Sequence, residues 1–144
     1  MLCVFAGSAP GAPREDLALA AAVGAALAGV GVPIVYGGGS TGCMGAMADA
    51  FVVLPGGLGT LDELGEVLTW AQLGIHAKPT VLVDPEGYWR PLVEWIDRAV
   101  LRGYVSVPAR DFLVTVCDAA DVLPAVRAFV APTATRGPLS LDQT

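Results

Sequence analysis

Two glycine-rich segments of this 144-residue sequence carry the residue types that bind phosphate. The first spans residues 36–45 (YGGGSTGCMG) and the second spans residues 54–63 (LPGGLGTLDE). Glycines let the backbone approach a phosphate closely, and the free N–H groups at the start of a following helix bind the anion. Ser40 and Thr60 add hydroxyl donors. The sequence therefore predicts two strand–turn–helix junctions that hold a phosphate group through backbone amides.

The first segment also matches the dinucleotide-binding pattern G-x-G-x-x-G between Gly37 and Gly42. A tight turn with close packing of helix on strand explains the same glycines. A dinucleotide site further needs an acidic residue about 20 residues on, at the end of a second strand. That strand ends here in Pro55 and Gly56, and Asp62 stands where the second segment would need its third glycine. Dinucleotide binding is therefore not favoured.

Glu63 has two interpretations, which the sequence leaves open. Thr60 and Glu63 form the pattern of a capping box, in which each side chain satisfies a free N–H group at a helix start. In the functional interpretation, Glu63 and Glu66 share one helix face with Trp70, one turn beyond a phosphate-binding loop and well placed to meet a ribose. The leucines expected on the opposite face, toward the core, are Leu61, Leu64 and Leu68.

Other catalytic groups are scarce in this sequence. His76 is the only histidine, which excludes a histidine-based metal site and a Ser-His-Asp triad. A Schiff-base enzyme would have to use Lys78, the only lysine, which stands beside Pro79 in an expected turn. The cysteines have no CxxC spacing, and their odd number suits reduced, buried thiols; they are Cys3, Cys43 and Cys117.

Short apolar runs alternate with longer periodic segments, which is the signature of βαβ units around a parallel sheet. We expect strands at residues 2–6, 32–36, 51–54, 80–83 and 113–116. We expect helices at residues 13–28, from residue 42 onward, and at residues 60–73, 89–102 and 119–130. The sequence thus predicts one α/β domain over residues 1–131, a Rossmann-like doubly wound parallel sheet with helices on both faces, and a flexible tail at 132–144.

Composition and charge exclude several classes of protein. Apolar residues make up 54% of the chain, so it can bury a core and is not disordered. The net charge of −6 argues against binding to nucleic acid or to an anionic membrane. Residues 17–36 carry no charge, but glycines and Pro33 interrupt them, so we expect no membrane span. With no basic leader pattern either, we expect a cytoplasmic protein.

One junction does not fit this pattern. A helix that begins near Gly42 would still be running at Ala50, yet Phe51 opens an apolar strand at once. A connection from a helix to a parallel strand usually takes about 2–6 residues. The sequence therefore indicates that a segment is missing between Ala50 and Phe51.

At these residues the chain resembles the LOG ("lonely guy") family of cytokinin riboside 5′-monophosphate phosphoribohydrolases, whose members were often called lysine decarboxylases. The signature PGGxGTxxE at residues 55–63 is the most specific match. The resemblance runs through the Trp89 helix to about Val130, and its other matching stretches are residues 3–8 (CVFAGS), 36–45, 66–74 (EVLTWAQLG) and 87–88.

This resemblance implies hydrolysis of the N-glycosidic bond of an adenosine-type 5′-monophosphate, to free base and ribose 5-phosphate, without cofactor or metal. It implies a catalytic role for Glu63, with Glu66 as a supporting acid. It also implies a homodimer or a higher homo-oligomer, with sites near the subunit interface. The positions that it assigns to the substrate and its phosphate are Ser8, Gly38, Gly39, Ser40, Gly42, Gly56, Gly57, Gly59 and Thr60.

The chain departs from the family at the same junction. Between residues 50 and 51 the family has several dozen further residues, among them an arginine that is the expected partner of Glu63. Either the protein carries a natural deletion, or the chain as printed lacks an internal segment, and the abrupt change from helix to strand favours the second. A continuous chain without that arginine is expected to hydrolyse nucleotides weakly or not at all.

Two other functions stay open at this point. The first is a non-catalytic carrier or sensor of the same fold, which would bind a nucleotide or a molybdenum cofactor without releasing a base. The second is a true lysine decarboxylase, which the isolated Lys78 does not favour.

Overall fold

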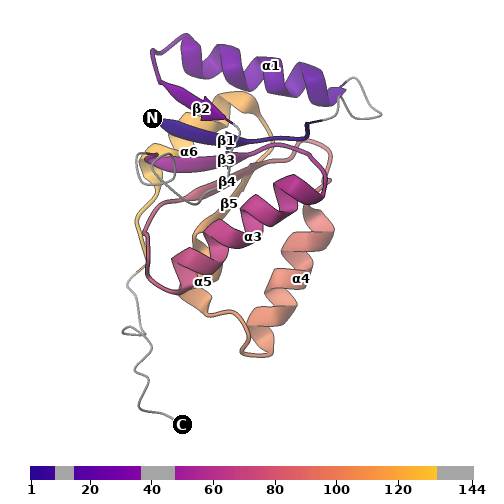
Figure 1. Cartoon of the computed structure of the whole chain (residues 1–144), viewed down its shortest axis with the longest axis vertical. Coiled ribbons are helices and arrows are strands. Elements are labelled where there is room, and N and C mark those ends of the chain that lie inside the picture. The colour runs from indigo at the N-terminus through magenta and orange to yellow at the C-terminus, as the bar shows by residue number, and fades with distance from the viewer. Residues whose placement is uncertain (9–14, 37–47, 133–144) are drawn as a thin grey trace.

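The computed structural model describes residues 1–8, 15–36 and 48–132. Its centre is a five-stranded sheet in which every pair of neighbours is parallel, with the strand order β2-β1-β3-β4-β5 (Figure 1). The bounds are Leu2–Phe5 for β1, Ile34–Tyr36 for β2, Ala50–Val53 for β3, Thr80–Val83 for β4 and Leu113–Val116 for β5. All five predicted strands are confirmed to within two residues at each end.

Helices connect these strands. The bounds are Glu15–Ala28 for α1, Leu58–Gln72 for α3, Arg90–Leu101 for α4, Val107–Asp111 for α5, Ala119–Asp121 for the 3-10 helix η1 and Val122–Ala128 for α6. The sequence did not predict α5, and its last helix is divided into η1 and α6. The helix expected from Gly42 and most of the tail lie outside the described residues. Within the described ranges, no helix is long and apolar enough to cross a membrane.

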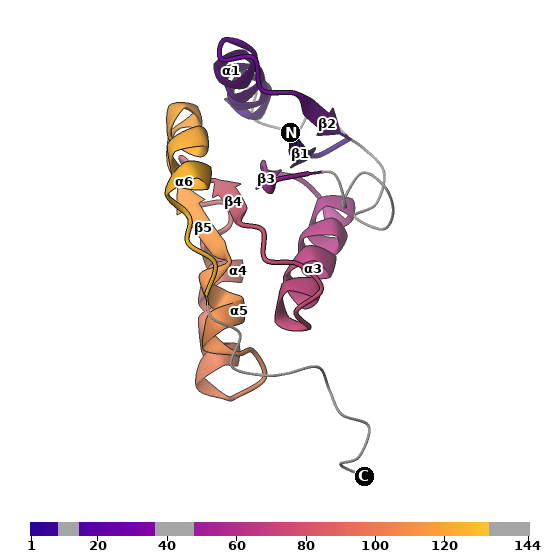
Figure 2. The ribbon, with the colours of Figure 1, turned by 90° about the vertical axis from the view of Figure 1, so that its left-hand side faces the viewer.

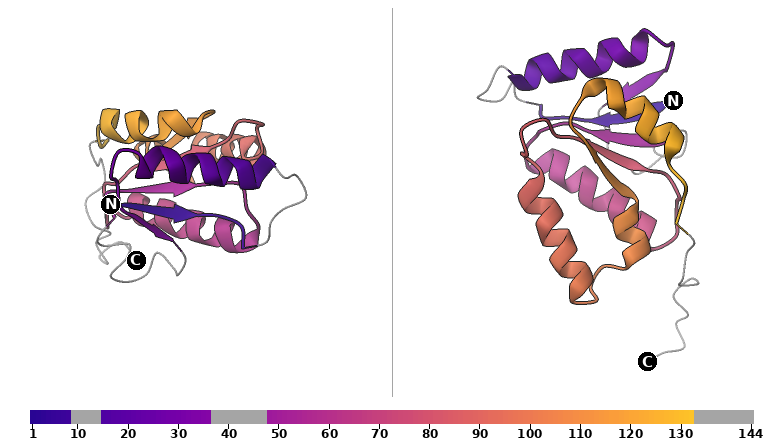
Figure 3. Two further views of the ribbon diagram at one scale, coloured as in Figure 1. Left: turned by 90° about the horizontal axis from the view of Figure 1, so that it is seen from above. Right: turned by 180° about the vertical axis from the view of Figure 1, so that it is seen from behind.

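Side chains of the sheet alternate between two apolar layers, because successive residues of a strand point to opposite faces. On one face, Cys3 joins a buried cluster with residues of α3 and α4, such as Leu64. On the other face, Leu2 joins a cluster with Val23 of α1 and Val122 of α6. Figures 2 and 3 show α3 and α6 on opposite sides of the strands. The predicted doubly wound α/β domain is confirmed.

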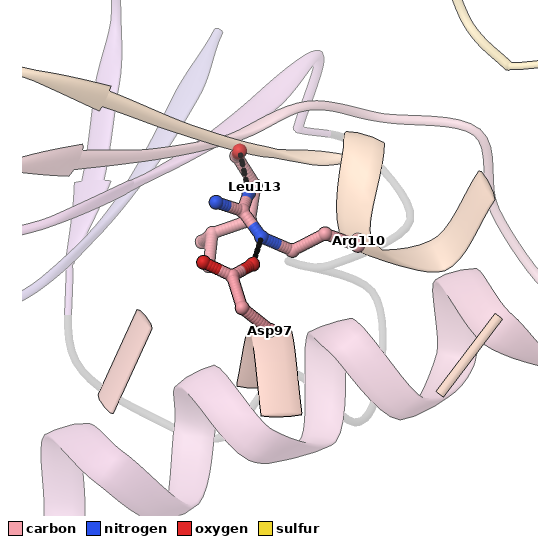
Figure 4. A network of polar contacts seen from close by, with 3 residues as sticks. All are labelled: Asp97, Arg110 and Leu113. Atoms are coloured by element: carbon pink, nitrogen blue, oxygen red, sulfur yellow. Dashed lines mark hydrogen bonds and ion pairs between the residues drawn. The ribbon is translucent and has the colours of Figure 1, made fainter. Parts of the chain in front are cut away.

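The short helix α5 is tied to both of its neighbours by Arg110. Its Nε donates to Oδ1 of Asp97 in α4 at 2.6 Å, and its Nη1 donates to the carbonyl of Leu113 at 3.0 Å (Figure 4). Ser106 begins the helix as its N-cap, where its hydroxyl accepts from the N–H of Ala109. This arrangement links the second half of α4 to the start of β5.

The junction at Ala50 differs from the sequence prediction. Ala50 is the first residue of β3, is fully buried and lies opposite Leu2, while Phe51 follows it in the same strand opposite Cys3. The N–H of Asp49 already donates to the carbonyl of Met1 at 2.8 Å. The expectation that a helix is still running at Ala50 is therefore wrong, because pairing with β1 draws residues 49 and 50 to the strand side.

The thiols also differ from the prediction in part. Cys3 is buried in the sheet, as expected, and is free. Cys117 is free but exposed, because it follows the last strand at the surface. Cys43 lies outside the described residues.

Candidate functional site

The candidate site lies at the carboxyl ends of β1 and β3, where the connecting helices change from one face of the sheet to the other. The helix that follows β1 packs on one face of the sheet and the helix that follows β3 packs on the other, although β1 and β3 are neighbours. In open parallel sheets, ligands bind in the crevice at the carboxyl ends of two such strands. Here that crevice is bordered by Gly7 and Ser8 after β1 and by the turn at Pro55–Gly57 after β3.

The turn after β3 leads directly into α3 and leaves its first amides available. Gly57 is the N-cap of α3, and the first backbone hydrogen bond of the helix runs from the N–H of Leu61 to the Gly57 carbonyl at 3.0 Å. The N–H groups of residues 57–60 precede this bond, so they lie at the positive end of the helix dipole. Such a terminus binds an anion without a lysine or arginine.

The capping-box interpretation of Glu63 is wrong. Thr60 is the third residue of α3 rather than its N-cap, and its side chain is buried at 3% exposure. A capping box requires the threonine at the N-cap position, which Gly57 occupies without a side chain. The pair of Thr60 and Glu63 therefore does not close the start of this helix.

Close packing, and not an unusual backbone angle, requires glycine at position 56. A Cβ placed on Gly56 would lie 2.2 Å from Oγ1 of Thr60 and 2.8 Å from the backbone nitrogen of Gly7. That nitrogen donates to the carbonyl of Pro55 at 3.4 Å, a long hydrogen bond across the two strand ends. The turn is thus pressed against both the end of β1 and the first turn of α3.

Glu63 lies half-buried beside the sheet. Burial raises the pKa of its carboxyl group, and the negative charges of Asp62 and Glu66 raise that pKa further. Burial also raises the pKa of the Cys3 thiol, and the charge of Glu63 adds to this effect. The negative charge of Glu63 therefore acts on a residue of β1. Nearby Asp62 is exposed, and Glu66 is half-buried.

The buried face of α3 differs from the leucine face that the sequence predicted. Leu64 is buried and Leu68 packs against the same cluster, as expected, but Leu61 is 39% exposed. The buried residues of the helix are Thr60, Leu64, Val67 and Ala71. This stripe is rotated from the predicted face because Thr60 packs under Gly56.

The loop between β4 and α4 supplies residues that the sequence analysis missed. The hydroxyl of Tyr88 donates to the carbonyl of Gly56 at 2.6 Å. The buried carboxylate of Asp84 accepts from the N–H of Trp89 at 3.1 Å through Oδ2. Residues 87–88 belong to a stretch that resembles the family, which was the only signal that pointed to them.

His76 is a structural residue. Its Nε2 lies 2.9 Å from the carbonyl of Val67, while Nδ1 accepts from the N–H of Lys78 at 3.2 Å. This pair of contacts fits the neutral ring that carries its proton on Nε2. The ring lies between Phe51 and Phe112, at centroid distances of 5.3 Å and 6.3 Å. Burial lowers the pKa of His76.

A cavity of about 930 Å³ lies away from the glycine turn, between α3 and the pair α4 and α5. Its lining is mainly apolar and includes Leu61, Leu68 and Trp95. Arg98 and Arg102 also line it. No pattern in the sequence predicted this cavity.

The structure brings one part of the predicted site together and leaves another part undescribed. Glu63, Glu66 and the predicted phosphate-binding positions lie in one continuous turn and helix, and the exposed residue Ser8 follows the neighbouring strand; those positions are Gly56, Gly57, Gly59 and Thr60. The remaining predicted positions, Gly38, Gly39, Ser40 and Gly42, lie outside the described residues.

Fold and turn together define an α/β protein with a glycine-rich turn and a helix start at its topological switch point. Residues 42–126 match the family model described as "Possible lysine decarboxylase". The chain is 35% identical to the probable cytokinin riboside 5′-monophosphate phosphoribohydrolase LOGL5 of Oryza sativa subsp. japonica, over 91% of this chain and 73% of that protein. It is 33% identical to the phosphoribohydrolase LOG1 of Arabidopsis thaliana, over 90% of this chain and 83% of that protein. The chain therefore belongs to this family, the LOG family.

The alignment with the rice relative also shows a difference in length. It spans 179 positions but covers 91% of the 144 residues, which is about 131 residues, so about 48 positions have no counterpart in this chain.

Proposed function

We propose that this protein hydrolyses the N-glycosidic bond of N6-substituted adenosine 5′-monophosphates, to give the free base and ribose 5-phosphate. The observation that carries the proposal is the placement of Glu63, half-buried one turn beyond the open amides of α3. A phosphate on those amides would place the attached ribose beside this carboxylate. The relatives support the proposal because their names describe the same reaction.

In this proposal each group has a distinct role. The amides of residues 57–60 hold the 5′-phosphate, and the buried side chain of Thr60 supports the turn. The transition state of glycosidic cleavage carries positive charge on the ribose, which the carboxylate of Glu63 stabilises while it orients the attacking water. Glu66 keeps the local potential negative. The raised pKa of Glu63 makes this carboxylate a stronger base once it is ionised.

We further propose that the intact protein has an internal segment that this chain lacks. The length difference in the rice alignment supports it. The sequence suggested a break between Ala50 and Phe51, but Ala50 pairs with Leu2 in β3, so the segment would join ahead of Asp49. We call a chain that carries the LOG1 segment of Arabidopsis thaliana at that point the extended chain. The 144-residue chain should bind nucleotides yet hydrolyse them weakly.

Chromatography of released base tests this function. The extended chain is incubated with adenosine 5′-monophosphate, its N6-prenylated form and the matching phosphate-free nucleosides. Base should be released from the monophosphates only, because the phosphate positions the ribose. Saturable binding of the monophosphates with no base release would favour the carrier instead. Failure of both forms of the chain to bind any monophosphate would overturn the site itself.

We also propose a homodimer in the cytoplasm. The cavity between α3 and α4 is bordered by Trp95 and Tyr104, which are 57% and 75% exposed, and an apolar surface of this kind is typical of a protein interface. A second copy that covers it would bury both rings. Sedimentation should show a dimer that Trp95→Glu converts to a monomer, and a monomeric wild type would contradict the proposal. The free thiols of Cys3 and Cys117 support a reducing compartment.

A further inference from the structure

We propose that Tyr88 is a positioning residue that orients the anion-binding amide of Gly57, an inference that rests on the proposed function. Tyr88 lies 32 positions from Gly56 in the sequence, and its hydroxyl donates to the Gly56 carbonyl at 2.6 Å. The ligand that we expect at this amide is a phosphate monoester. In the described part of the chain, no other hydrogen bond joins the β4–α4 loop to the turn after β3.

The geometry of the peptide bond explains why this contact acts on the ligand side. The carbonyl of Gly56 and the N–H of Gly57 belong to one planar trans peptide, so they point in opposite directions. A donor that fixes the carbonyl therefore fixes the direction of the N–H. Hydrogen bonding at the carbonyl also polarises the peptide and makes its N–H a stronger donor. Since Gly57 is the N-cap of α3, this N–H lies at the positive end of the helix.

The turn needs such a contact because glycine alone does not fix it. Gly56 and Gly57 have no side chains to lock the peptide between them, and glycine backbones lose the most freedom on folding. Gly56 is pressed against Thr60 and Gly7 on one side. The Tyr88 hydroxyl holds the same residue through its carbonyl. Together these contacts leave one orientation of the peptide.

Tyr88 is itself held in place by the β4–α4 loop. The N–H of the next residue, Trp89, donates to the buried carboxylate of Asp84, and Trp89 is 5% exposed. The rings of Tyr88 and Trp89 meet edge to face, with centroids 5.0 Å apart. Gly87 turns the chain with a φ of 79°, a conformation that favours glycine. Tyr88 as a whole residue is nevertheless 54% exposed.

The hydroxyl acts through the turn and not directly on the phosphate. A phenol has one proton to donate, and here that proton is directed to Gly56. The lone pairs that remain on the hydroxyl oxygen can only accept a hydrogen bond, and an ionised phosphate oxygen has no proton to donate to them. Removing the hydroxyl should therefore weaken phosphate binding by loosening the turn.

The variant Tyr88→Phe tests this, with Tyr104→Phe as the matched control. Tyr104 is 75% exposed, and its carbonyl accepts from Gln72 at the C-terminal end of α3, the end opposite to the glycine turn. Its hydroxyl has no hydrogen-bond partner in the described part of the chain. The 144-residue chain is titrated with ribose 5-phosphate, inorganic phosphate and adenosine, followed by NMR. We expect Tyr88→Phe to weaken both phosphate ligands about threefold to tenfold, the effect of one hydrogen bond, and to leave adenosine unchanged. The Gly57 amide resonance should shift without ligand, while Tyr104→Phe changes neither readout.

Each other result counts against the inference in a distinct way. Unchanged phosphate affinity in Tyr88→Phe would overturn the role of Tyr88 and leave the proposed function standing. An equal loss for adenosine and for the phosphate ligands would also overturn it, because that pattern indicates a general structural role. If the wild-type chain binds neither phosphate ligand, the anion site and the inference both fail.

Discussion

A methyl group on Gly56 would meet Thr60 at 2.2 Å from its hydroxyl oxygen and 2.7 Å from its Cβ. Thr60 is buried, and the backbone of Gly7 blocks the other side at 2.8 Å, so neither neighbour can move away easily. The turn after β3 is therefore built around the absence of a side chain at this one position.

The first prediction follows from this contact. Gly56→Ala should destabilise the protein by about 1–3 kcal/mol, the usual cost of overpacking. Gly59→Ala is the control, because a Cβ there meets nothing within 4 Å and alanine is the better helix former, so stability should stay equal or rise by up to about 1 kcal/mol. Urea unfolding without ligand measures both variants. Equal stabilities of the two would contradict the packing argument.

The second prediction concerns the reaction. Glu63→Gln in the extended chain should lower base release by about 100-fold or more, because the amide cannot stabilise a positively charged ribose. Its affinity for ribose 5-phosphate should change little, since the amides of α3 are intact. The control is Asp62→Asn, whose side chain is the exposed neighbour and should leave release at neutral pH unchanged. A fully active Glu63→Gln would refute the proposed mechanism.

The third prediction is a shift in the pH profile of base release. Burial and the charges of Asp62 and Glu66 raise the pKa of Glu63, and hydrolysis needs the ionised form, so activity should fall on the acid side above the usual glutamate range. Asp62→Asn removes one negative neighbour and stabilises the ionised form, which lowers that pKa. The acid limb of kcat/KM should therefore move to lower pH in Asp62→Asn. A limb that stays in place or moves upward would argue against Glu63 as the titrating group.

The fourth prediction concerns stability against pH. Burial lowers the pKa of His76 in the folded chain, whereas the unfolded chain titrates near the ordinary histidine value of about 6.5. The unfolded state therefore binds the proton first, and folding stability should decrease as pH falls from about 6.5 toward the lower folded pKa. Above a pH of about 6.5, both states hold a neutral His76, and its contribution to the free energy of unfolding is complete.

The variant His76→Asn isolates this contribution. Its amide oxygen can replace Nδ1 as the acceptor for the N–H of Lys78, but it does not titrate. Urea midpoints between pH 5 and 7.5 should fall with acid more steeply in the wild type than in the variant. Parallel curves for the two proteins would show that the ring is not held neutral by the fold.

Much of the architecture could be predicted from the sequence because it depends on local patterns. Continuous apolar runs with no polar alternation indicate strands that are covered on both faces, and all five such runs form parallel strands. The second glycine turn was also predicted from a local pattern, because P-G-G-x-G between an apolar run and a periodic segment indicates a tight turn that leads into a helix. The position of Glu63, one turn into that helix, follows from its spacing.

Local preferences also caused the errors. Threonine is a favoured N-cap, so Thr60 was placed at the start of α3, whereas the structure gives that position to Gly57 and buries Thr60. Alanine favours helices, so Ala50 was assigned to one, whereas its hydrogen-bonded position beside Leu2 makes it a strand residue. The helix α5 is five residues long and too short to show a periodic pattern.

The sequence by itself therefore determined the fold class, the glycine turn and the acidic residue that follows it, because each depends on residues close together in the chain. Only the tertiary structure decided which face of α3 is buried, that Gly56 is pressed against Gly7, and that Tyr88 holds the Gly56 carbonyl. These contacts join residues 32 or more positions apart. Their geometry depends on how β1, β3 and β4 align in the sheet, which no local spacing encodes.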